Sequence, residues 1–240
     1  MQEEQSVRLY LKPFTTSFGG DDREALRSLV RRVIRPGCRI IEIGSWMGTG
    51  STQVMIEELL GVPDVKLFCV DTWKGSSNVV RHQQIVSEYD AAASFRRNVS
   101  LAGGEGIVRQ LVMSSEDAAT LSRDQQFDLV FIDGDHSYAQ TKIDIALWQL
   151  KVRQGGVLCG HDCECRPVGG LGQMVLAAPD VDAIPGEGTK FSVIHPGVVL
   201  AVEEAFSGRA HLWSEEEMQR PDGSVGRATI WDIVIEHHAN

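Results

Sequence analysis

The sequence predicts an α/β protein with a mostly parallel sheet and helices on both faces of it. Short apolar or β-branched segments alternate with longer amphipathic segments along most of the chain. This alternation is typical of successive βαβ units. The 240 residues are a usual length for one α/β domain. We therefore expect residues 1–240 to form a single domain, with residues 1–20 as an N-terminal arm or cap.

About seven strands are expected. The first five lie in the segments "CRIIEI", "KLFCVD", "GIVRQLVMS", "FDLVFID" and "GGVLCG". Amphipathic segments between them, such as "STQVMIEELLG" and "YAQTKIDIALWQLK", predict helices. Two more strands are expected in "KFSVI" and "ATIWDIVIE". They flank a helix that begins near Pro196, since proline is favoured in the first helical turn.

The composition excludes several classes of partner. The chain carries 33 acidic and 23 basic residues, for a formal net charge of -10, so it repels nucleic acid. No apolar run approaches the roughly 18 residues that a membrane span needs. The first residues, "MQEEQSVR", do not resemble a secretory signal. The five cysteines are an odd number, which indicates free thiols. We expect a cytoplasmic protein whose partner is a small molecule.

A glycine-rich segment, "IIEIGSWMGTGS" (residues 40–51), follows the first expected strand. It is not a triphosphate loop, because no lysine follows Gly50. It is not a dinucleotide fingerprint either, because the spacing from Gly44 to Gly48 differs from G-x-G-x-x-G. Glu42 stands at the strand end, where a carboxylate favours a cation or an ammonium over a phosphate. S-adenosylmethionine (SAM) fits these features, since it has a sulfonium, an ammonium and no phosphate.

At this point the sequence resembles the class I SAM-dependent methyltransferases, whose first motif, E/D-x-G-x-x-x-G-x-G/S, is similar to "EIGSWMGTGS". The resemblance implies a Rossmann-like class I methyltransferase sandwich that binds SAM. Asp71 would accept the ribose hydroxyls, a spacing that NAD enzymes share. Ser115 would contact adenine, or it would cap the next helix. The cofactor-binding residues implied are Glu42, Gly44, Ser45, Trp46, Gly48, Ser51, Asp71, Thr72, Trp73, Ser115, Glu116 and Asp133.

Acidic and imidazole side chains follow two neighbouring strands. Asp133, Asp135 and His136 come directly after "FDLVFI", and His161 and Asp162 follow "GVLCG". The carboxyl ends of these strands meet at one edge of the sheet. Carboxylates that gather there repel one another unless a cation or a proton holds them. Such oxygen-rich ligands suit Mg²⁺ or another hard divalent cation.

With "VDTWKG" and "FIDGDHSY", the sequence resembles the subgroup of macrocin-type and cephamycin-type O-methyltransferases. By position, the resemblance implies that Asp133 and Asp162 hold a metal, with His161 where the family has an acid or amide. We expect a SAM-dependent O-methyltransferase of a small hydroxylated acceptor, such as a sugar, a glycoside or a catechol-like compound. His136 is the first choice of general base and Asp135 the second.

Other interpretations stay open at this stage. A non-catalytic SAM-binding or nucleoside-binding module would keep the same pocket, and an NAD-dependent oxidoreductase would use the same type of sheet. Cys159, Cys163 and Cys165 alternate with His161, so a thiolate metal site forms if the strand continues through them. An arm like that of residues 1–20 can also pack on a neighbouring subunit, which leaves a homo-oligomer open.

Overall fold

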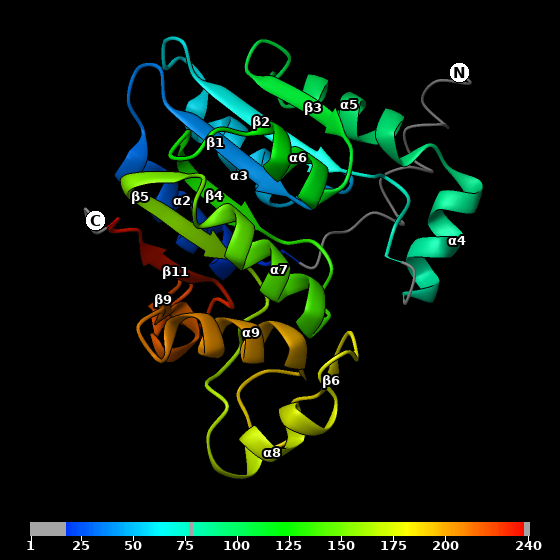
Figure 1. The fold of residues 1–240 in the computed structure, drawn as a ribbon, viewed down its shortest axis with the longest axis vertical. Helices are drawn as coiled ribbons and strands as arrows, with labels where there is room; N and C mark the ends of the chain where they lie inside the picture. The colour runs from blue at the N-terminus through cyan, green and yellow to red at the C-terminus, as the bar shows by residue number, and fades with distance from the viewer. Residues whose placement is uncertain (1–17, 77–78, 238–240) are drawn as a thin grey trace.

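The computed structural model describes residues 18–76 and 79–237. Its central sheet contains β1 (Arg39–Ile43), β2 (Lys66–Asp71), β3 (Val108–Val112), β4 (Phe127–Ile132), β5 (Val152–Gly160), β8 (His211–Leu212) and β11 (Trp231–Val234). The strand order is β3-β2-β1-β4-β5-β11-β8 (Figure 1). Strands β1 to β5 are parallel to one another. Strand β11 runs antiparallel to both β5 and β8. The predicted α/β class with a seven-stranded, mostly parallel sheet is confirmed.

Helices cover both faces of the sheet. They are α2 (Gly20–Val33), α3 (Ser51–Leu59), α4 (Val80–Glu88), α5 (Ala91–Leu101), α6 (Ser115–Leu121), α7 (Tyr138–Trp148), α8 (Gly169–Ala177) and α9 (Pro196–Phe206). One core cluster joins the sheet to α2, α3 and α5, and the other joins it to α6, α7 and α9. Side chains alternate along each strand, so Ile40 belongs to the first cluster and Ile41 to the second.

Polar caps and a proline mark where several helices begin. Asp90 accepts the N–H of Ala93 at 2.8 Å and caps α5. The Ser137 hydroxyl caps α7 in the same way. Helix α9 begins with Pro196, as its sequence predicts. These caps satisfy helical N–H groups that otherwise have no partner.

The sixth strand predicted in "KFSVI" does not join the sheet. Only Val193–Ile194 (β7) is extended, and it pairs with Ile184–Pro185 (β6) in a separate hairpin. The N–H and C=O of Phe191 are both engaged by the Thr189 hydroxyl in a turn, so they are not free for a ladder. The place beside β5 is taken by β11. The two-residue strand β8 has no sequence signal of its own, because a strand that short shows no periodicity.

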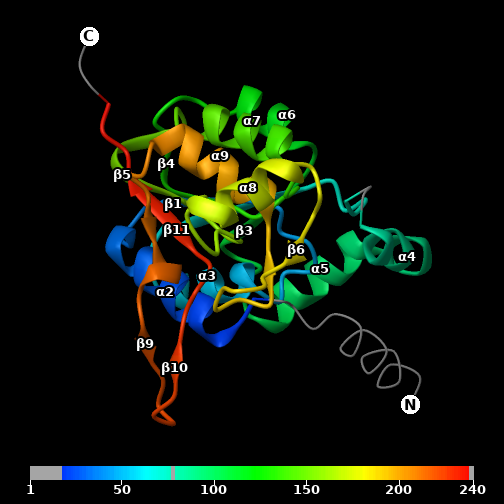
Figure 2. The same cartoon turned by 90° about the horizontal axis from the view of Figure 1, so that it is seen from below.

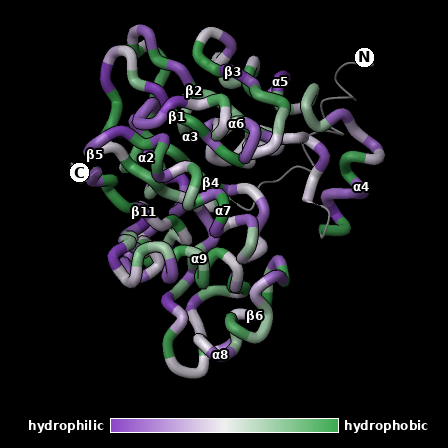
Figure 3. Tube along the Cα trace, in the orientation of Figure 1, coloured by the Kyte–Doolittle hydropathy of each residue, from purple (hydrophilic) through white to green (hydrophobic). Residues whose placement is uncertain are grey.

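Segments outside the sheet complete the chain. A short helix (Trp213–Glu215) precedes a hairpin of β9 (Met218–Gln219) and β10 (Val225–Gly226), which projects from the body in Figure 2. Polar and apolar stretches alternate along the trace in Figure 3. Among the described residues, no helix combines the length and the apolar character needed to cross a membrane. Most of the predicted arm, residues 1–17, lies outside the described residues.

Candidate functional site

A cavity of about 630 Å³ opens at the carboxyl ends of β1, β2 and β4. Open α/β sheets bind their ligands at this edge. Of the residues predicted to bind a cofactor, those that line the cavity are Gly44, Ser45, Trp46, Gly48, Ser51, Asp71, Thr72, Ser115, Glu116 and Asp133. Asp135, His136 and Asp162 line it as well. Glu42, Trp73 and His161, which lie in the described part of the chain, do not.

The glycine loop forms the floor of the cavity. Gly44 has a φ of +88°, and a Cβ atom placed on it would lie 1.9 Å from the backbone oxygen of Asp133. Gly48 has a φ of +71°. Glycine is the residue that adopts such angles at low cost and leaves room for the end of β4. The loop therefore turns sharply and brings Ser51, the first residue of α3, to the cavity.

The structure corrects the expectation that Glu42 faces the ligand. Its side chain is completely buried and accepts hydrogen bonds from the hydroxyls of Ser51 at 2.5 Å and Thr52 at 2.6 Å. Burial raises the pKa of Glu42 to about 7, although these hydrogen bonds act in the opposite direction. Strand alternation places Glu42 on the same face as Ile40, beneath α3. Glu42 therefore anchors the start of α3 to β1.

Asp71, at the end of β2, is held by backbone amides. Its Oδ2 accepts the N–H of Trp46 at 2.8 Å, and its Oδ1 accepts the N–H of Trp73 at 2.6 Å. Burial raises the pKa of Asp71, and the amide hydrogen bonds counteract this effect. Each carboxylate oxygen has a second lone pair. Asp71 can therefore still accept hydroxyl groups of a ligand.

The two tryptophans near Asp71 have different places. The Trp46 ring lines the cavity and stacks on His82 of α4, with ring centroids 4.7 Å apart. The Trp73 indole N–H donates to the C=O of Trp46 at 2.6 Å, and its ring packs against Phe95. Trp46 thus forms a wall of the cavity, whereas Trp73 supports it from the core. His82 is a lining residue that the sequence reasoning missed.

A polar group closes the end of the cavity near α6 and α7. Ser114, not Ser115, caps α6. The Ser115 hydroxyl donates to the buried carboxyl of Asp144. Gln140 donates to both Glu116 and Asp144 at 3.2 Å. Burial raises the pKa of Asp144 to about 7. The sequence reasoning missed Asp144 and Gln140. The one sequence feature that could have pointed to them is that Asp144 is an acid within the apolar stripe of a helix.

The ends of β4 and β5 bring together a group that we term the acid–imidazole cluster. It consists of Asp133, His136, His161, Asp162 and His195, flanked by Asp22, Glu164 and Asp182. The Nε2 of His136 lies 3.1 Å from the Oδ2 of Asp162 and 3.8 Å from the Oδ1 of Asp133. The Nδ1 of His161 lies 3.1 Å from the Oδ1 of Asp162. The predicted metal ligands and the predicted base are thus neighbours.

Two carboxylates that the sequence reasoning missed hold imidazoles of the cluster. The Oδ1 of Asp182 lies 2.9 Å from the Nδ1 of His136. The Oε1 of Glu164 lies 2.6 Å from the Nδ1 of His195, and its other oxygen accepts the N–H of His195 at 3.0 Å. Neither acid belongs to a recognisable motif, and Asp182 lies 46 positions from its partner. Sequence spacing alone could not have found these pairs.

The carboxylates and imidazoles of the cluster shift one another's pKa values. Burial lowers the pKa of His136, but the charge of Asp162 and hydrogen bonds to Asp133 and Asp182 outweigh it and hold that pKa well above its usual value. The pKa of His161 is raised in the same way. The pKa of Asp162 is lowered by its imidazole neighbours in spite of burial. The carboxylates around His136 therefore shift its pKa upwards, unlike that of the unperturbed imidazole expected from the sequence.

The donor atoms fit a divalent cation. Ligand atoms of His136, Asp162 and His195 lie within 4.8 Å of one another, and so do those of Asp133, His161 and Asp162. Each set includes at least one imidazole nitrogen. Mg²⁺ prefers oxygen ligands, whereas Zn²⁺, Co²⁺ and Fe²⁺ accept imidazole readily. The residues therefore suit a transition ion better than the Mg²⁺ expected from the sequence.

The alternating cysteines do not form a metal site. Strand β5 ends at Gly160, and the chain then turns through Asp162, whose φ is +60°. Cys159 consequently lies in the core cluster beneath α2 and α3, and Cys163 lies in the cluster on the opposite face. Among the residues that the structure describes, the gathered candidate metal ligands include no cysteine.

Comparison with known proteins identifies the family. Residues 41–163, just over half of the chain, match the family described as "Methyltransferase domain". No curated protein matches the chain. Three solved structures share the fold at low identity, which shows the fold alone. The cofactor-bound Rv0187 from MTB is 16% identical with a TM-score of 0.61, and the match covers 98% of this chain and 90% of that chain. An O-methyltransferase from Bacillus cereus in complex with SAH is 16% identical with a TM-score of 0.57, and the match covers 97% of this chain and 90% of that chain. The O-methyltransferase TomG from Streptomyces achromogenes, involved in tomaymycin synthesis and in complex with SAM, is 18% identical with a TM-score of 0.55, and the match covers 99% of this chain and 100% of that chain.

The family match covers the glycine loop, the end of β2 and the ends of β4 and β5, where the cavity lies. The fold agrees with it over nearly the whole chain. Most residues that line the cavity therefore lie in the segment that matches the family. The chain belongs to the methyltransferase domain family, and it is a SAM-dependent methyltransferase.

Proposed function

We propose that this protein transfers the methyl group of SAM to a hydroxyl oxygen of a small acceptor, such as a sugar, a glycoside or a catechol-like compound. One observation carries the proposal: the glycine loop and the acid–imidazole cluster open into the same cavity. Two proteins with a similar fold, both O-methyltransferases bound to SAM or SAH, support it. The motifs shared with macrocin-type and cephamycin-type enzymes favour a sugar or another hydroxylated small molecule.

The cofactor would lie along the loop from Gly44 to Ser51. Its carboxylate would meet the N-terminal amides of α3, where the helix dipole favours a negative charge. Asp71 would accept the ribose hydroxyls, and the Trp46 ring would pack on the nucleoside. Ser115, Glu116 and Asp144 line the cavity beyond Asp71, and carboxyl oxygens there suit an exocyclic amine such as that of adenine.

Methyl transfer moves the methyl group from the sulfur of SAM to the acceptor oxygen and releases the hydroxyl proton. The acceptor oxygen attacks the methyl carbon, the C–S bond breaks, and its electron pair stays on the sulfur to give SAH. The hydroxyl proton must leave, and His136 and Asp135 are the side chains of the cavity that we propose for it. Asp135 is oriented by the N–H of Ser137 at 2.8 Å. A divalent cation held by Asp133 and Asp162 would lower the pKa of the acceptor hydroxyl.

The raised pKa of His136 bears on the choice between these two bases. A protonated ring donates to the acceptor oxygen, and it accepts a proton only after losing its own. A neighbouring cation would lower the pKa of His136 again. If His136 is the base, His136→Gln abolishes turnover and Asp135→Asn leaves most of it. The opposite pattern assigns the proton to Asp135.

Two alternatives are less well supported. A nucleoside-binding module without catalysis has no need of an acid–imidazole cluster in its cavity. The family match sets aside the NAD-dependent oxidoreductase. We also propose that residues 1–240 act as one domain, without nucleic acid or membrane as a partner.

The proposal is tested by incubating the full chain with methyl-labelled SAM and a panel of hydroxylated acceptors. We expect SAH to form together with a labelled methyl ether for at least one class of acceptor, and Asp162→Ala to abolish both products. SAM binding without SAH formation across sugars, glycosides and catechols would favour the binding module instead.

A further inference from the structure

We infer that the divalent cation lies between His136, Asp162 and His195, and that it is a transition ion such as Zn²⁺ or Co²⁺ rather than Mg²⁺. The sequence places the ion on the other side of Asp162, with His161 and Asp133. This position rests on the metal part of the proposed function. A His136 ring that binds the ion through Nε2 and Asp182 through Nδ1 cannot also take the hydroxyl proton, so the inference assigns that proton to Asp135. The site can be tested without any methyl acceptor. Its support comes from how the imidazoles on the two sides of Asp162 are held.

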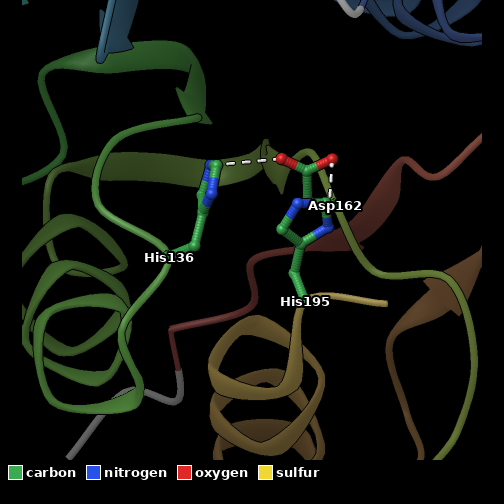
Figure 4. A group of neighbouring side chains, drawn as sticks. All are labelled: His136, Asp162 and His195. Carbon is green, nitrogen blue, oxygen red and sulfur yellow. Dashed lines mark ion pairs between the residues drawn. The ribbon is translucent and has the colours of Figure 1, made fainter. Parts of the chain in front are cut away.

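Three separate parts of the chain supply the ligands. His136 comes from the loop after β4, Asp162 from the turn after β5, and His195 from the residue before α9. Figure 4 shows the Asp162 carboxylate between the two rings. Its Oδ2 lies 3.1 Å from the Nε2 of His136, and its Oδ1 lies 3.5 Å from the Nδ1 of His195. The ring centroids are 4.8 Å apart. Each of the three residues therefore offers a donor atom within 4.8 Å of the other two.

Each of these two imidazoles has its own orienting carboxylate. Asp182 engages the Nδ1 of His136 at 2.9 Å, and Glu164 engages the Nδ1 of His195 at 2.6 Å. A metal-binding histidine almost always donates its other ring N–H to a carboxylate, a carbonyl or water, which fixes the ring and raises its basicity. For His136 the engaged Nδ1 leaves Nε2, which faces Asp162, as the ligand nitrogen. For His195 it leaves Nε2 as well, although Nδ1 is the nitrogen that lies 3.5 Å from Asp162.

The burial and the two contacts of Glu164 support this orienting role. The residue is only 3% exposed, so a charge there is costly unless it has partners. Its two oxygens engage the backbone N–H and the ring of the same histidine, His195. A buried carboxylate that fixes both the backbone and the ring of one residue leaves that ring a single orientation.

His161 lacks such support. Its Nδ1 faces Asp133 and Asp162, but its Nε2 lies 3.5 Å from the Oδ2 of Asp22 and makes no hydrogen bond within the described chain. The ring packs against Phe18, with centroids 4.9 Å apart. His161 therefore fits a partner of the carboxylates of Asp133 and Asp162 better than a metal ligand.

The chemical nature of the ligands selects the ion. Two imidazoles and one carboxylate form a set that binds first-row transition ions, and the remaining coordination positions face water or substrate. Mg²⁺ loses its water reluctantly and prefers oxygen ligands. Because His136 and Asp162 line the cavity, those open positions would face the place proposed for the acceptor.

The test uses full-length protein stripped of metal with a chelator and then titrated with Co²⁺ alone or Mg²⁺ alone in a calorimeter. We expect one site for Co²⁺, with an affinity at least tenfold higher than that for Mg²⁺. The visible absorption of bound Co²⁺ should report nitrogen ligands. His195→Gln should weaken Co²⁺ binding about 10- to 100-fold, and so should Glu164→Gln, which removes only the orienting charge.

His161→Gln is the matched control, because it removes an imidazole from the other side of Asp162. We expect its Co²⁺ affinity to stay close to that of the wild type. Loss of Co²⁺ binding in His161→Gln, with binding kept in both His195→Gln and Glu164→Gln, would overturn the inference. Tighter binding of Mg²⁺ than of Co²⁺ by the wild type would overturn it as well.

SAM binding measured on the same samples separates this inference from the proposed function. Co²⁺ binding without SAM binding would contradict the proposed function and leave the metal site standing. SAM binding without Co²⁺ binding would refute the metal site and leave the methyl donor in place. Normal SAM binding by the variants also shows that they are folded.

Discussion

The backbone N–H of Trp46 donates to the carboxylate of Asp71 at 2.8 Å, and this bond joins the glycine loop after β1 to the end of β2. The two segments that would hold the methionine part and the ribose of the cofactor are therefore joined directly by a hydrogen bond within the protein. A preorganised pocket spends less binding energy on ordering its own parts.

Asp71→Asn should weaken SAM binding. The amide keeps the size of the side chain but turns an NH₂ group towards one of the two backbone N–H donors, those of Trp46 and Trp73. A buried donor without an acceptor costs about 1–3 kcal/mol, so we expect the Kd for SAM to rise about 10- to 100-fold. Calorimetry measures it. Asp124→Asn, at an exposed ion pair with Lys151, should leave the Kd unchanged.

Gly44→Ala should destabilise the fold severely. Its Cβ would lie 1.9 Å from the backbone oxygen of Asp133, so the loop and the end of β4 would have to separate. Gly37→Ala is the matched control, because Gly37 has a similar φ of +76° with nothing within 4 Å of the added atom. We expect a loss of about 1 kcal/mol for Gly37→Ala from backbone strain alone, and a much larger loss for Gly44→Ala. Urea unfolding compares them, and equal losses would contradict this account of the loop.

Stability should depend on pH through Glu42. Its pKa rises from 4.5, the ordinary value of a glutamate, to about 7 in the folded protein because the side chain is buried. The folded state therefore binds more protons between these two values, so stability falls as the pH rises from about 4.5 to about 7. The loss is roughly 3 kcal/mol for a shift of this size. Glu42→Gln should remove this part of the slope and be at least as stable as the wild type above pH 7.

Urea unfolding of the wild type and Glu42→Gln at several pH values measures the effect. Glu57→Gln, on the exposed face of the same helix α3, should keep the slope of the wild type. Asp144 has a pKa of about 7 as well, so Asp144→Asn should remove a second part of the slope. Identical slopes for Glu42→Gln and the wild type would mean that Glu42 is not the titrating group.

Removing the metal should separate catalysis from cofactor binding. We expect a chelator, or Asp162→Ala, to lower methyl transfer at least 100-fold while the Kd for SAM changes little. The physical reason is that Asp162 lies in the acid–imidazole cluster, whereas the loop and Asp71 are the proposed cofactor contacts. The rate of SAH formation and the Kd are measured on the same preparation. Turnover at the rate of the wild type in Asp162→Ala would show that no cation is needed there.

Much of the fold could be predicted, because hydrophobic periodicity records which face of each element is buried. Strand β4 is buried along its whole length, and its unbroken apolar run "FDLVFI" shows this directly. Strand β8 and the hairpin of β6 and β7 could not be predicted, since two-residue strands carry no periodicity. Pairing in such short strands depends on neighbours that are distant in the sequence.

The candidate site was predicted where residues follow strand ends and missed elsewhere. Asp133 and Asp162 lie at the ends of adjacent parallel strands, so strand order alone brings them together. Glu164, Asp182 and Asp144 reach the site from a loop or a helix, and their roles depend on burial and partners that the sequence does not show. Glu42 was placed at the correct strand end, but strand alternation turns its side chain into the core.

The most direct test of the central claim is a calorimetric titration of the metal-stripped full chain with SAM, first in a chelator and then after saturation with Co²⁺. Because the loop and Asp71 are held by backbone hydrogen bonds and not by the residues proposed to bind the ion, we expect saturable binding at one site in both conditions. No detectable SAM binding in either condition would contradict the assignment of the cavity to the methyl donor.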